Sequence, residues 1–419
     1  MPSPRVITLG CRLNTLESEI IRSNKSEKSL DNTIIINTCA VTAEAERQAR
    51  QTIRRLHKEN PKDRIIVTGC AAQLNPDSFT SLKGVDRVVG NTEKMNFSQL
   101  IAEDKKNKIN VSDIMEVKDT YDLPSIHGFQ DRTRAFVQIQ QGCNHRCTFC
   151  IIPFARGPNR SVSPKNIIRQ IDTLTKNGHL EVVLTGVDIS SYGKDHENFP
   201  SLGKLATEIL HQVKALRRLR VTSLDPAFVD DELLLLMANE DRFMPHLHLS
   251  LQAADDIILK RMKRRHTRDS AIDLVKRVRV IRPDVIFGAD LIAGFPTESE
   301  AMFENTLKAV NEMGLTYLHV FPYSARPGTP ATKMPAVKKD LITERARRLR
   351  EVGDLALRNY LKSKLGKSVE VLVEKNQKGH TRHFATVDLT FDAPVGSIVE
   401  AKAIAVDEKK GRLIADFAA

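Results

Sequence analysis

The chain has 419 residues, of which 41% are hydrophobic and 28% are charged, an ordinary composition for a soluble protein with two or three well-packed domains. The N-terminal residues carry no apolar signal-peptide core, and no stretch approaches the roughly 18 uninterrupted apolar residues of a membrane span. We therefore expect a cytoplasmic protein with no membrane partner. The formal net charge of +12 favours a polyanionic partner such as a nucleic acid.

Residues 1–118 alternate short β-like runs with helical segments, which is typical of a parallel sheet of the flavodoxin or Rossmann kind. The β-like runs are residues 5–10, 32–38 and 64–69. Each run is followed directly by a cysteine: Cys11, Cys39 and Cys70. Because ligands gather at the carboxyl ends of parallel strands, we expect these thiols to meet at one sheet edge. A lone cysteine is most often a small buried hydrophobe, but three at equivalent positions favour a metal site.

Residues 119–131 lack periodicity and are predicted to be a linker. A second βα series follows within residues 132–362. Its strand-like runs are residues 134–140, 181–186, 218–224, 246–252, 284–295 and 316–324. Helical segments separate most of these runs. Six strands are fewer than the eight of a closed barrel, so we predict an incomplete, laterally open (βα)6 barrel.

The pattern changes again after a helix expected around residues 341–362. The last part, residues 363–419, contains strand-like runs at 368–375, 381–391, 397–407 and 412–418. This predicts a small antiparallel β-barrel, a kind of module often used on RNA. Its basic and acidic side chains are equal in number over residues 366–419, so charge alone does not make it an RNA anchor.

The remaining cysteines, Cys143, Cys147 and Cys150, form a compact C-x3-C-x2-C run after the first strand of the second series. Three thiolates suit a 4Fe–4S cluster with one iron left open. S-adenosylmethionine can chelate such an iron, and an electron from the cluster then releases a deoxyadenosyl radical. A zinc site would need a fourth ligand, and His145 inside the tight loop is poorly placed to supply it. Structural disulfides are disfavoured in a reducing compartment.

Residues 132–169 surround this motif with basic side chains and contain no acid. Positive charge here would draw a nucleic acid to the reactive iron. We predict RNA phosphate contacts for Arg156 and Arg160, with a cofactor carboxylate or an acid elsewhere in the protein as the alternative partners. Phe154 and Tyr192 are candidates for stacking on an RNA base, although either fits a core position equally well.

The chain resembles the methylthiotransferases of the radical S-adenosylmethionine superfamily over nearly its whole length. The resemblance rests on residues 8–19, 36–55, 67–73, 141–161, 184–193, 249–268, 288–298 and 321–331. Within that family, the sequences LGCRLNTLESE and NTCAVT are similar to the branch that modifies N6-threonylcarbamoyladenosine at tRNA position 37. The resemblance implies a TRAM-like C-terminal barrel and tRNA, through its anticodon loop, as the polyanionic partner.

The same resemblance implies a second 4Fe–4S cluster on the three dispersed cysteines, with sulfur on its open iron. One S-adenosylmethionine methylates that sulfur, and a second yields the radical that abstracts hydrogen from C2 of the adenine. The cofactor-binding residues that it implies are Gly186, Ser223 and Gln252. Each of these also fits a strand-end group satisfied by backbone. Asp188 stands where relatives more often have His or Asn, so it receives no role. We expect a monomer with an electron donor of the flavodoxin or ferredoxin type.

Three alternatives remain open. The same chemistry can act on isopentenyladenosine in tRNA or on an aspartate of a ribosomal protein. Another two-cluster radical enzyme can insert sulfur into a small molecule, although this leaves the C-terminal barrel without a purpose. A non-enzymatic RNA-binding protein with structural clusters would release no deoxyadenosine from S-adenosylmethionine.

Overall fold

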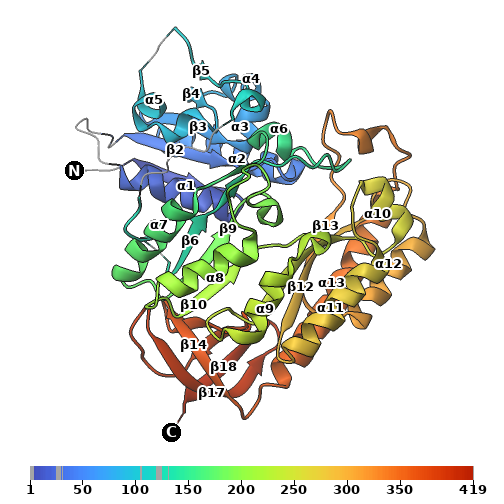
Figure 1. Ribbon diagram of the computed structural model, residues 1–419. Coiled ribbons are helices and arrows are strands. Elements are labelled where there is room, and N and C mark those ends of the chain that lie inside the picture. Colours follow the sequence, from blue (N-terminus) through green and yellow to red (C-terminus); the bar gives the residue numbers. More distant parts are fainter. Residues whose placement is uncertain are drawn as a thin grey trace.

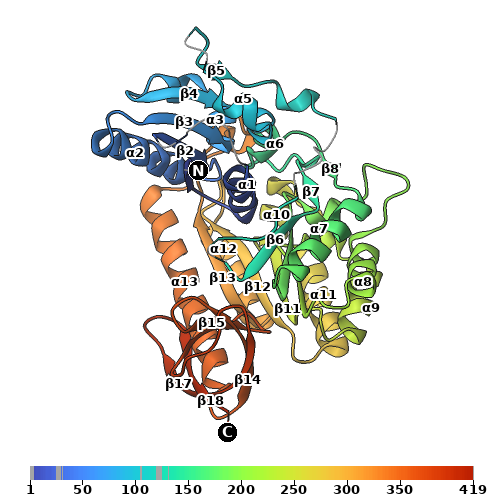
Figure 2. The same ribbon diagram turned by 90° about the vertical axis from the view of Figure 1, so that its left-hand side faces the viewer.

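The computed structural model describes residues 4–24, 30, 32–103, 106–118, 125–130 and 132–418 (Figure 1). Three parts follow one another along the chain: an N-terminal sheet, a central half-barrel and a small closed barrel. Figures 1 and 2 show the half-barrel between the other two parts, which lie at opposite ends of the molecule. No helix in the described ranges is long and apolar enough to cross a membrane.

The N-terminal sheet has five parallel strands in the order β1-β2-β3-β4-β5. They are β1 (Arg5–Thr8), β2 (Thr33–Thr38), β3 (Arg64–Gly69), β4 (Val85–Val89) and β5 (Ile109–Asn110). The predicted parallel α/β class is confirmed, but the strands run in sequence order and lack the reversal of flavodoxin-like and Rossmann sheets. The helices of this part are α1 (Arg12–Ser23), α2 (Ala43–Glu59), α3 (Cys70–Leu74), α4 (Asp77–Thr80) and α5 (Phe97–Ile101), with 3-10 turns η1 (Glu93–Met95) and η2 (Ile114–Glu116).

Helices cover both faces of this sheet, which explains why β2 is buried along its whole length. Ile34 and Ile36 pack against the buried face of α2. Ile35, which points the other way, packs with Ile21 of α1 and Leu100 of α5. The sheet is therefore a core element, and its carboxyl edge is the place where polar and metal-ligating groups can gather.

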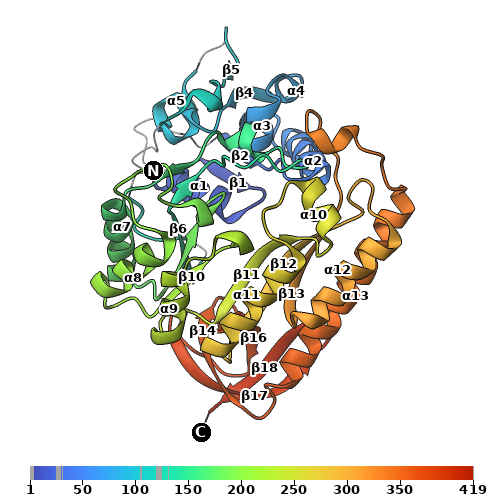
Figure 3. The same cartoon turned by 45° about the vertical axis from the view of Figure 1, so that its right-hand side comes forward.

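The half-barrel consists of two three-stranded parallel sheets, ordered β6-β9-β10 and β11-β12-β13 (Figure 3). Its strands are β6 (Arg134–Gln138), β9 (Glu181–Thr185), β10 (Arg218–Val221), β11 (His246–Gln252), β12 (Ile286–Ala293) and β13 (Leu315–Pro322). Isolated parallel bridges, Leu219 to Phe243 and Leu224 to Leu249, join the two sheets. Among the described residues β6 and β13 do not pair, so the predicted open six-stranded barrel is confirmed.

Helices lie outside these strands and alternate with them along the chain. They are α6 (Ile152–Arg156), α7 (Pro164–Lys176), α8 (Leu202–Gln212), α9 (Asp231–Asn239), α10 (Asp256–Met262), α11 (Arg268–Ile281), α12 (Glu300–Glu312) and α13 (Lys339–Lys362). The 3-10 turns are η3 (Ile189–Ser191), η4 (Pro226–Phe228) and η5 (Pro330–Lys333), and β7 (Gln140–Gln141) pairs with β8 (Arg160–Ser161) across the base of the cysteine loop. The core of this part is apolar and continuous from α7 to α13.

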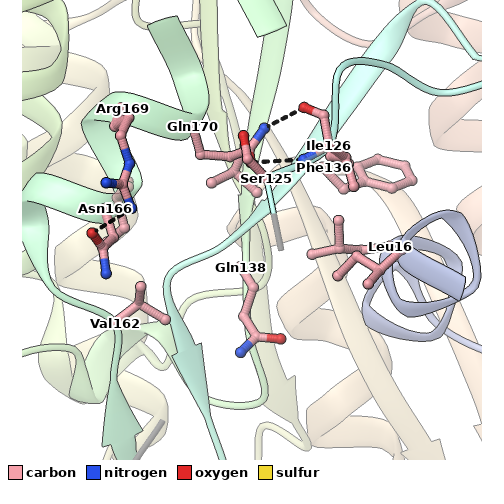
Figure 4. A pocket seen from close by; sticks show the side chains of 12 residues that line it. Leu16, Ser125, Ile126, Phe136, Gln138, Val162, Asn166, Arg169 and Gln170 are labelled. Atoms are coloured by element: carbon pink, nitrogen blue, oxygen red, sulfur yellow. Dashed lines mark hydrogen bonds between the residues drawn. The ribbon is translucent and has the colours of Figure 1, made fainter. Parts of the chain in front are cut away.

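Part of the predicted linker packs into the half-barrel. Residues 119–124 and 131 lie outside the described residues, whereas Ile126 and Phe129 are buried in the half-barrel core. Figure 4 shows how α7 fixes this segment: Gln170 Nε2 donates to the Ile126 carbonyl at 2.8 Å, and the Ile126 N–H donates to Gln170 Oε1 at 3.1 Å. The small pocket drawn there has a volume of about 50 Å³, too small for a nucleoside cofactor.

The C-terminal part is a closed barrel with the strand order β14-β15-β16-β18-β17. Its strands are β14 (Ser368–Glu374), β15 (Lys378–Thr381), β16 (Thr386–Leu389), β17 (Ile398–Asp407) and β18 (Arg412–Phe417). The barrel is confirmed, with two differences from the prediction: β16 and β18 pair in parallel, and the run 381–391 is not one strand. A turn breaks that run at Phe384, whose φ is 71°.

This turn docks the closed barrel on the strand starts of the half-barrel, the end opposite the cysteines (Figure 1). The Phe384 ring stacks on His246 with a centroid distance of 5.0 Å. The guanidinium groups of Arg134 and Arg220 lie 5.1 and 5.4 Å from the same ring. Arg218 donates to Glu370 of β14 at 2.7 Å. Polar and aromatic contacts therefore hold this interface.

Candidate active site between the two cysteine sets

The compact set lies in the loop between β7 and α6, above the carboxyl end of β6. The loop closes on itself through the Cys143 N–H, which donates to the Gly157 carbonyl at 3.0 Å, and the Cys150 N–H, which donates to the Cys147 carbonyl at 3.1 Å. Burial raises the pKa of the Cys150 thiol to about 11. Burial and the nearby Asp188 carboxylate raise the pKa of Cys143. Thiolates are disfavoured there without a compensating cation, which iron supplies on binding.

The dispersed set lies where predicted, at the carboxyl ends of the neighbouring strands β1, β2 and β3. Cys11 precedes α1, Cys39 follows β2 and Cys70 begins α3. The loops approach each other closely: a Cβ added at Gly10, which has φ 101°, would lie 2.9 Å from Cys39 Sγ. Burial raises the pKa of Cys39 to about 11, and Cys70 and Cys11 add to that rise. The three thiols at the ends of three separate strands therefore lie close together.

Neither set is contracted around a single metal ion. Tetrahedral zinc with bonds of about 2.3 Å would bring its sulfur ligands to about 3.8 Å from one another. Among the described residues, only the group His248, Asp290 and His319 has three ligand atoms all within 4.8 Å of one another. The cysteines stand further apart, as expected when each thiolate binds a different iron of a cluster. Each set is therefore wider than a closed zinc site, which is compatible with a four-iron cluster.

One cavity of about 370 Å³ connects the two sets. Cys11 lines it from the N-terminal sheet, and all three cysteines of the compact set line it from the half-barrel. The structure also places Gly186, Ser223 and Gln252 on its wall, at the ends of β9, β10 and β11. These are the three residues for which the sequence predicts cofactor contact. A second cavity of about 230 Å³ adjoins it and shares Val41, Phe149, Gln252 and Asp290.

Charged residues that the sequence patterns did not single out also line this cavity. Arg264 lies with its Nη1 3.7 Å from Cys147 Sγ, and its Nη2 donates to Asp225 Oδ2 at 2.9 Å. His145 Nε2 lies 3.1 Å from Asp188 Oδ2, so the position left without a role contributes an acid beside the compact set. Arg264 was visible in the basic run RMKRRHTR, but nothing in that run distinguishes it from its solvent-exposed neighbours.

Arg156 is buried beneath the dispersed set, and its side chain is only 1% exposed. Its Nε donates to Cys70 Sγ at 3.0 Å, and its Nη2 donates to Asn14 Oδ1 at 2.6 Å. It also forms an ion pair with Glu17, which accepts from Lys94 Nζ at 2.5 Å. Burial alone would raise the pKa of Glu17, but Arg156 and Lys94 hold it at about 2. A side chain from the half-barrel thus supports a cysteine of the N-terminal sheet.

The predicted RNA contacts of Arg156 and Arg160 do not agree with this arrangement. Arg160 is 4% exposed, and its guanidinium donates to the carbonyls of Arg156 and Val117 at 2.8 and 3.2 Å. Neither guanidinium reaches the surface, so neither is available to an RNA phosphate in this structure. The sequence shows that charge is present near the loop but not the direction in which each side chain points. Tyr192 is likewise buried, whereas Phe154 is 45% exposed.

Comparisons with known proteins agree with this architecture. The Radical SAM superfamily matches residues 137–310, and the family described as Uncharacterized protein family UPF0004 matches residues 4–90. A radical S-adenosylmethionine methyltransferase, TsrM, from Kitasatospora setae shares the fold with a TM-score of 0.52, at 16% identity, over 73% of this chain and 65% of its own.

Relatives with higher identity extend over nearly the whole chain. The Threonylcarbamoyladenosine tRNA methylthiotransferase MtaB of Rickettsia prowazekii is 48% identical over 96% of this chain and 95% of its own length. The protein of the same name from Bacillus subtilis is 35% identical over 88% of this chain and 84% of its own. A tRNA-2-methylthio-N(6)-dimethylallyladenosine synthase from Wolbachia pipientis is 32% identical over 89% of this chain and 88% of its own. This chain therefore belongs to the radical S-adenosylmethionine tRNA methylthiotransferases, in the branch of the threonylcarbamoyladenosine enzymes.

Proposed function

We propose that this enzyme adds a methylthio group to C2 of N6-threonylcarbamoyladenosine at position 37 of tRNA. It would use two 4Fe–4S clusters and two molecules of S-adenosylmethionine, one as methyl donor and one as radical source. The observation that carries the proposal is the single cavity lined by cysteines of both sets. When bound, the clusters supply the electron that cleaves S-adenosylmethionine and the sulfur that is transferred.

The protein's own groups position the reactants in that cavity. Cys143, Cys147 and Cys150 would hold the cluster that binds S-adenosylmethionine, with Gly186, Ser223 and Gln252 against the cofactor. Cys11, Cys39 and Cys70 would hold the cluster that carries sulfur. An adenine between the two sets would present C2 to both reagents, which meets the need for proximity and orientation in a two-reagent reaction. The N-terminal part lies over this end of the half-barrel (Figure 1), which would limit the access of water to the radical.

Exposed cations and two aromatic rings around the compact loop support tRNA binding at this end. Arg146 lies 5.9 Å from the exposed Phe154 ring, and Lys194 and Arg265 lie 3.6 and 5.4 Å from the Phe228 ring. All three cations are exposed. We propose that they, rather than Arg156 and Arg160, contact the phosphates of the anticodon loop.

We also propose that the protein is a cytoplasmic monomer and that a donor of the flavodoxin or ferredoxin type reduces it.

The test is mass spectrometry of nucleosides after the anaerobically reconstituted enzyme has acted on tRNA that carries N6-threonylcarbamoyladenosine. We expect the 2-methylthio derivative and about eight irons per chain from two four-iron clusters. Parallel reactions with tRNA carrying isopentenyladenosine, and with ribosomal protein, examine the two alternative targets of the same chemistry. Methylthio transfer to either one in place of the proposed nucleoside would refute the proposal.

A further inference from the structure

We propose that Arg12 binds the carboxylate of the threonylcarbamoyl group and so selects this nucleoside over one with an uncharged N6 substituent. This inference rests on the proposed function, because it assumes that the target base enters the cavity between the cysteine sets. It adds a binding site for a specific anionic group to a wall that otherwise holds the clusters and S-adenosylmethionine.

Arg12 lies next to a cysteine of the dispersed set and lines the shared cavity. It is the first residue of α1, directly after Cys11. Within the part of the chain that the structure describes, its guanidinium makes no hydrogen bond or ion pair. Arg264, the other arginine on the cavity wall, is engaged by Asp225 and by the Ser250 carbonyl at 2.9 and 2.8 Å. Arg12 is therefore the arginine of this cavity that is available to a ligand.

The carboxylate that interacts electrostatically with Arg12 is occupied by other donors. Asp290 acts electrostatically on Arg12, but its own oxygens are engaged. Oδ1 lies 3.0 Å from His248 Nε2 and 3.1 Å from His319 Nδ1, and Oδ2 accepts from Ser223 Oγ at 3.3 Å. Arg134 and Arg220 also act electrostatically on Arg12, but each has an ion-pair partner of its own, Glu374 and Glu181 respectively. An arginine on a cavity wall, beside an acid that is occupied by other donors, is suited to an anionic ligand.

The chemistry of the nucleoside places its anionic group on the same side. In adenine, C2 and C6 are both bonded to N1, so a substituent on N6 starts close to the carbon that receives sulfur. The sulfur comes from the cluster that Cys11 would hold, and Arg12 is the next residue. The threonylcarbamoyl group ends in a carboxylate, for which the planar guanidinium is a bidentate partner. An isopentenyl group is apolar and has no charge or hydrogen-bond acceptor for the Arg12 guanidinium.

A divalent metal at His248, Asp290 and His319 is the competing explanation for this end of the cavity, because three of their ligand atoms lie within 4.8 Å of one another. The two Asp290–histidine distances are those of ordinary hydrogen bonds. The positive charge of Arg12, which interacts electrostatically with Asp290, also opposes the entry of a doubly charged cation. We therefore infer that His248 and His319 occupy the Asp290 carboxylate, so that it does not pair with Arg12.

The experiment uses two anticodon stem-loop RNAs, one with N6-threonylcarbamoyladenosine and one in which its carboxylate is a carboxamide. Reconstituted wild-type enzyme, Arg12→Gln and Arg12→Lys are compared in methylthio transfer and in RNA affinity. Wild type should prefer the carboxylate RNA by about 30-fold or more in kcat/KM, the loss expected when one partner of a partly buried charge pair is removed. Arg12→Gln should show no preference, and Arg12→Lys should retain part of it.

Arg5→Gln is the matched control, since Arg5 is an exposed arginine of the same sheet outside the cavity. It should behave as wild type. Iron and sulfide content, together with deoxyadenosine release without RNA, should be the same in all variants. Equal loss on both RNAs in Arg12→Gln would overturn the inference and assign Arg12 to the cluster or to S-adenosylmethionine. A stoichiometric non-iron metal that is lost in His319→Gln would also overturn it. Failure of wild type on both RNAs would instead refute the proposed function.

Discussion

Each of the two cysteine sets offers three thiols, but the two sets are built in different ways. The compact set is one loop, and the groups that touch it, His145, Asp188 and Arg264, all belong to the half-barrel. The dispersed set needs three strands of the N-terminal sheet to be assembled and is then touched by Arg156 from the half-barrel. The polar contacts to the first set thus come from its own part, although Ile151, next to Cys150, packs against the N-terminal core. The second set receives a polar contact from the other part of the molecule.

This difference has a functional consequence. If the proposed function holds, the compact set would generate the radical whether or not the N-terminal sheet is correctly loaded. The dispersed set would add the sulfur only after the sheet has formed and docked. Loss of the compact set should therefore stop both deoxyadenosine release and methylthio transfer. Loss of the dispersed set should stop methylthio transfer but leave part of the deoxyadenosine release.

The largest effect is expected for loss of the compact set. Replacing Cys143, Cys147 or Cys150 with Ala removes one of the three thiols that we propose as ligands of the radical-forming cluster. Release of deoxyadenosine from S-adenosylmethionine, measured by chromatography on reduced protein, should fall to the background level, and methylthio transfer should stop with it. A variant that still releases deoxyadenosine would contradict the assignment of this loop to radical formation.

The next largest effect should show whether the two cysteine sets have separate functions. Cys39→Ala should reduce iron from about eight to about four per chain and stop methylthio transfer, while part of the deoxyadenosine release remains. Cys11→Ala and Cys70→Ala should behave in the same way, because the three thiols act as one donor set. Iron content, deoxyadenosine and modified nucleoside are measured on the same preparation. Equal loss of both activities would show that the sets are not separate in function.

Sequence patterns predict the elements of this site better than its cross-contacts. The apolar runs before Cys11, Cys39 and Cys70 locate the strands, because a strand buried on both faces is apolar throughout. Parallel pairing then places the three cysteines at one edge. The sequential strand order does not follow from those runs, because hydrophobicity specifies that a strand is buried but not which neighbour it pairs with. The break at Phe384 was missed because its left-handed backbone conformation falls within a strand-like run.

Arg156 illustrates the same limit at the level of a side chain. Its neighbours are basic, and an arginine in a basic segment is usually solvated. It is buried because Glu17, which is 139 residues away in the sequence, supplies a charge that compensates its own. Such long-range pairing is invisible in the local pattern. Gly186, Ser223 and Gln252 were easier to predict, since strand-end positions of a barrel face its cavity by construction.

Arg156→Gln examines the dependence of the dispersed set on the half-barrel. The change removes a charged donor from Cys70 and leaves buried Glu17 with Lys94 alone, so we expect a loss of about 3–5 kcal/mol in the free energy of unfolding. The midpoint potential of the dispersed cluster, followed by electron paramagnetic resonance, should shift while that of the compact cluster stays constant. Arg169→Gln, at an exposed arginine, is the control. A shift of both potentials would contradict the one-way dependence.

The smallest effect is expected for a substitution at the strand starts of the half-barrel. This substitution lies far from both cysteine sets and is therefore a control for the comparison between them. Phe384→Ala removes a ring stacked on His246 and flanked by two guanidinium groups, which should cost about 1–3 kcal/mol in the free energy of unfolding, measured by thermal denaturation. Phe417→Ala removes a ring of the same closed barrel that is 67% exposed and should change stability by less than about 0.5 kcal/mol. Because Phe384 contacts the strand starts and both cysteine sets lie at the strand ends, Phe384→Ala should keep wild-type iron content and deoxyadenosine release. Loss of iron in this variant would mean that the two ends of the half-barrel are coupled, and that the cysteine sets depend on contacts far from them.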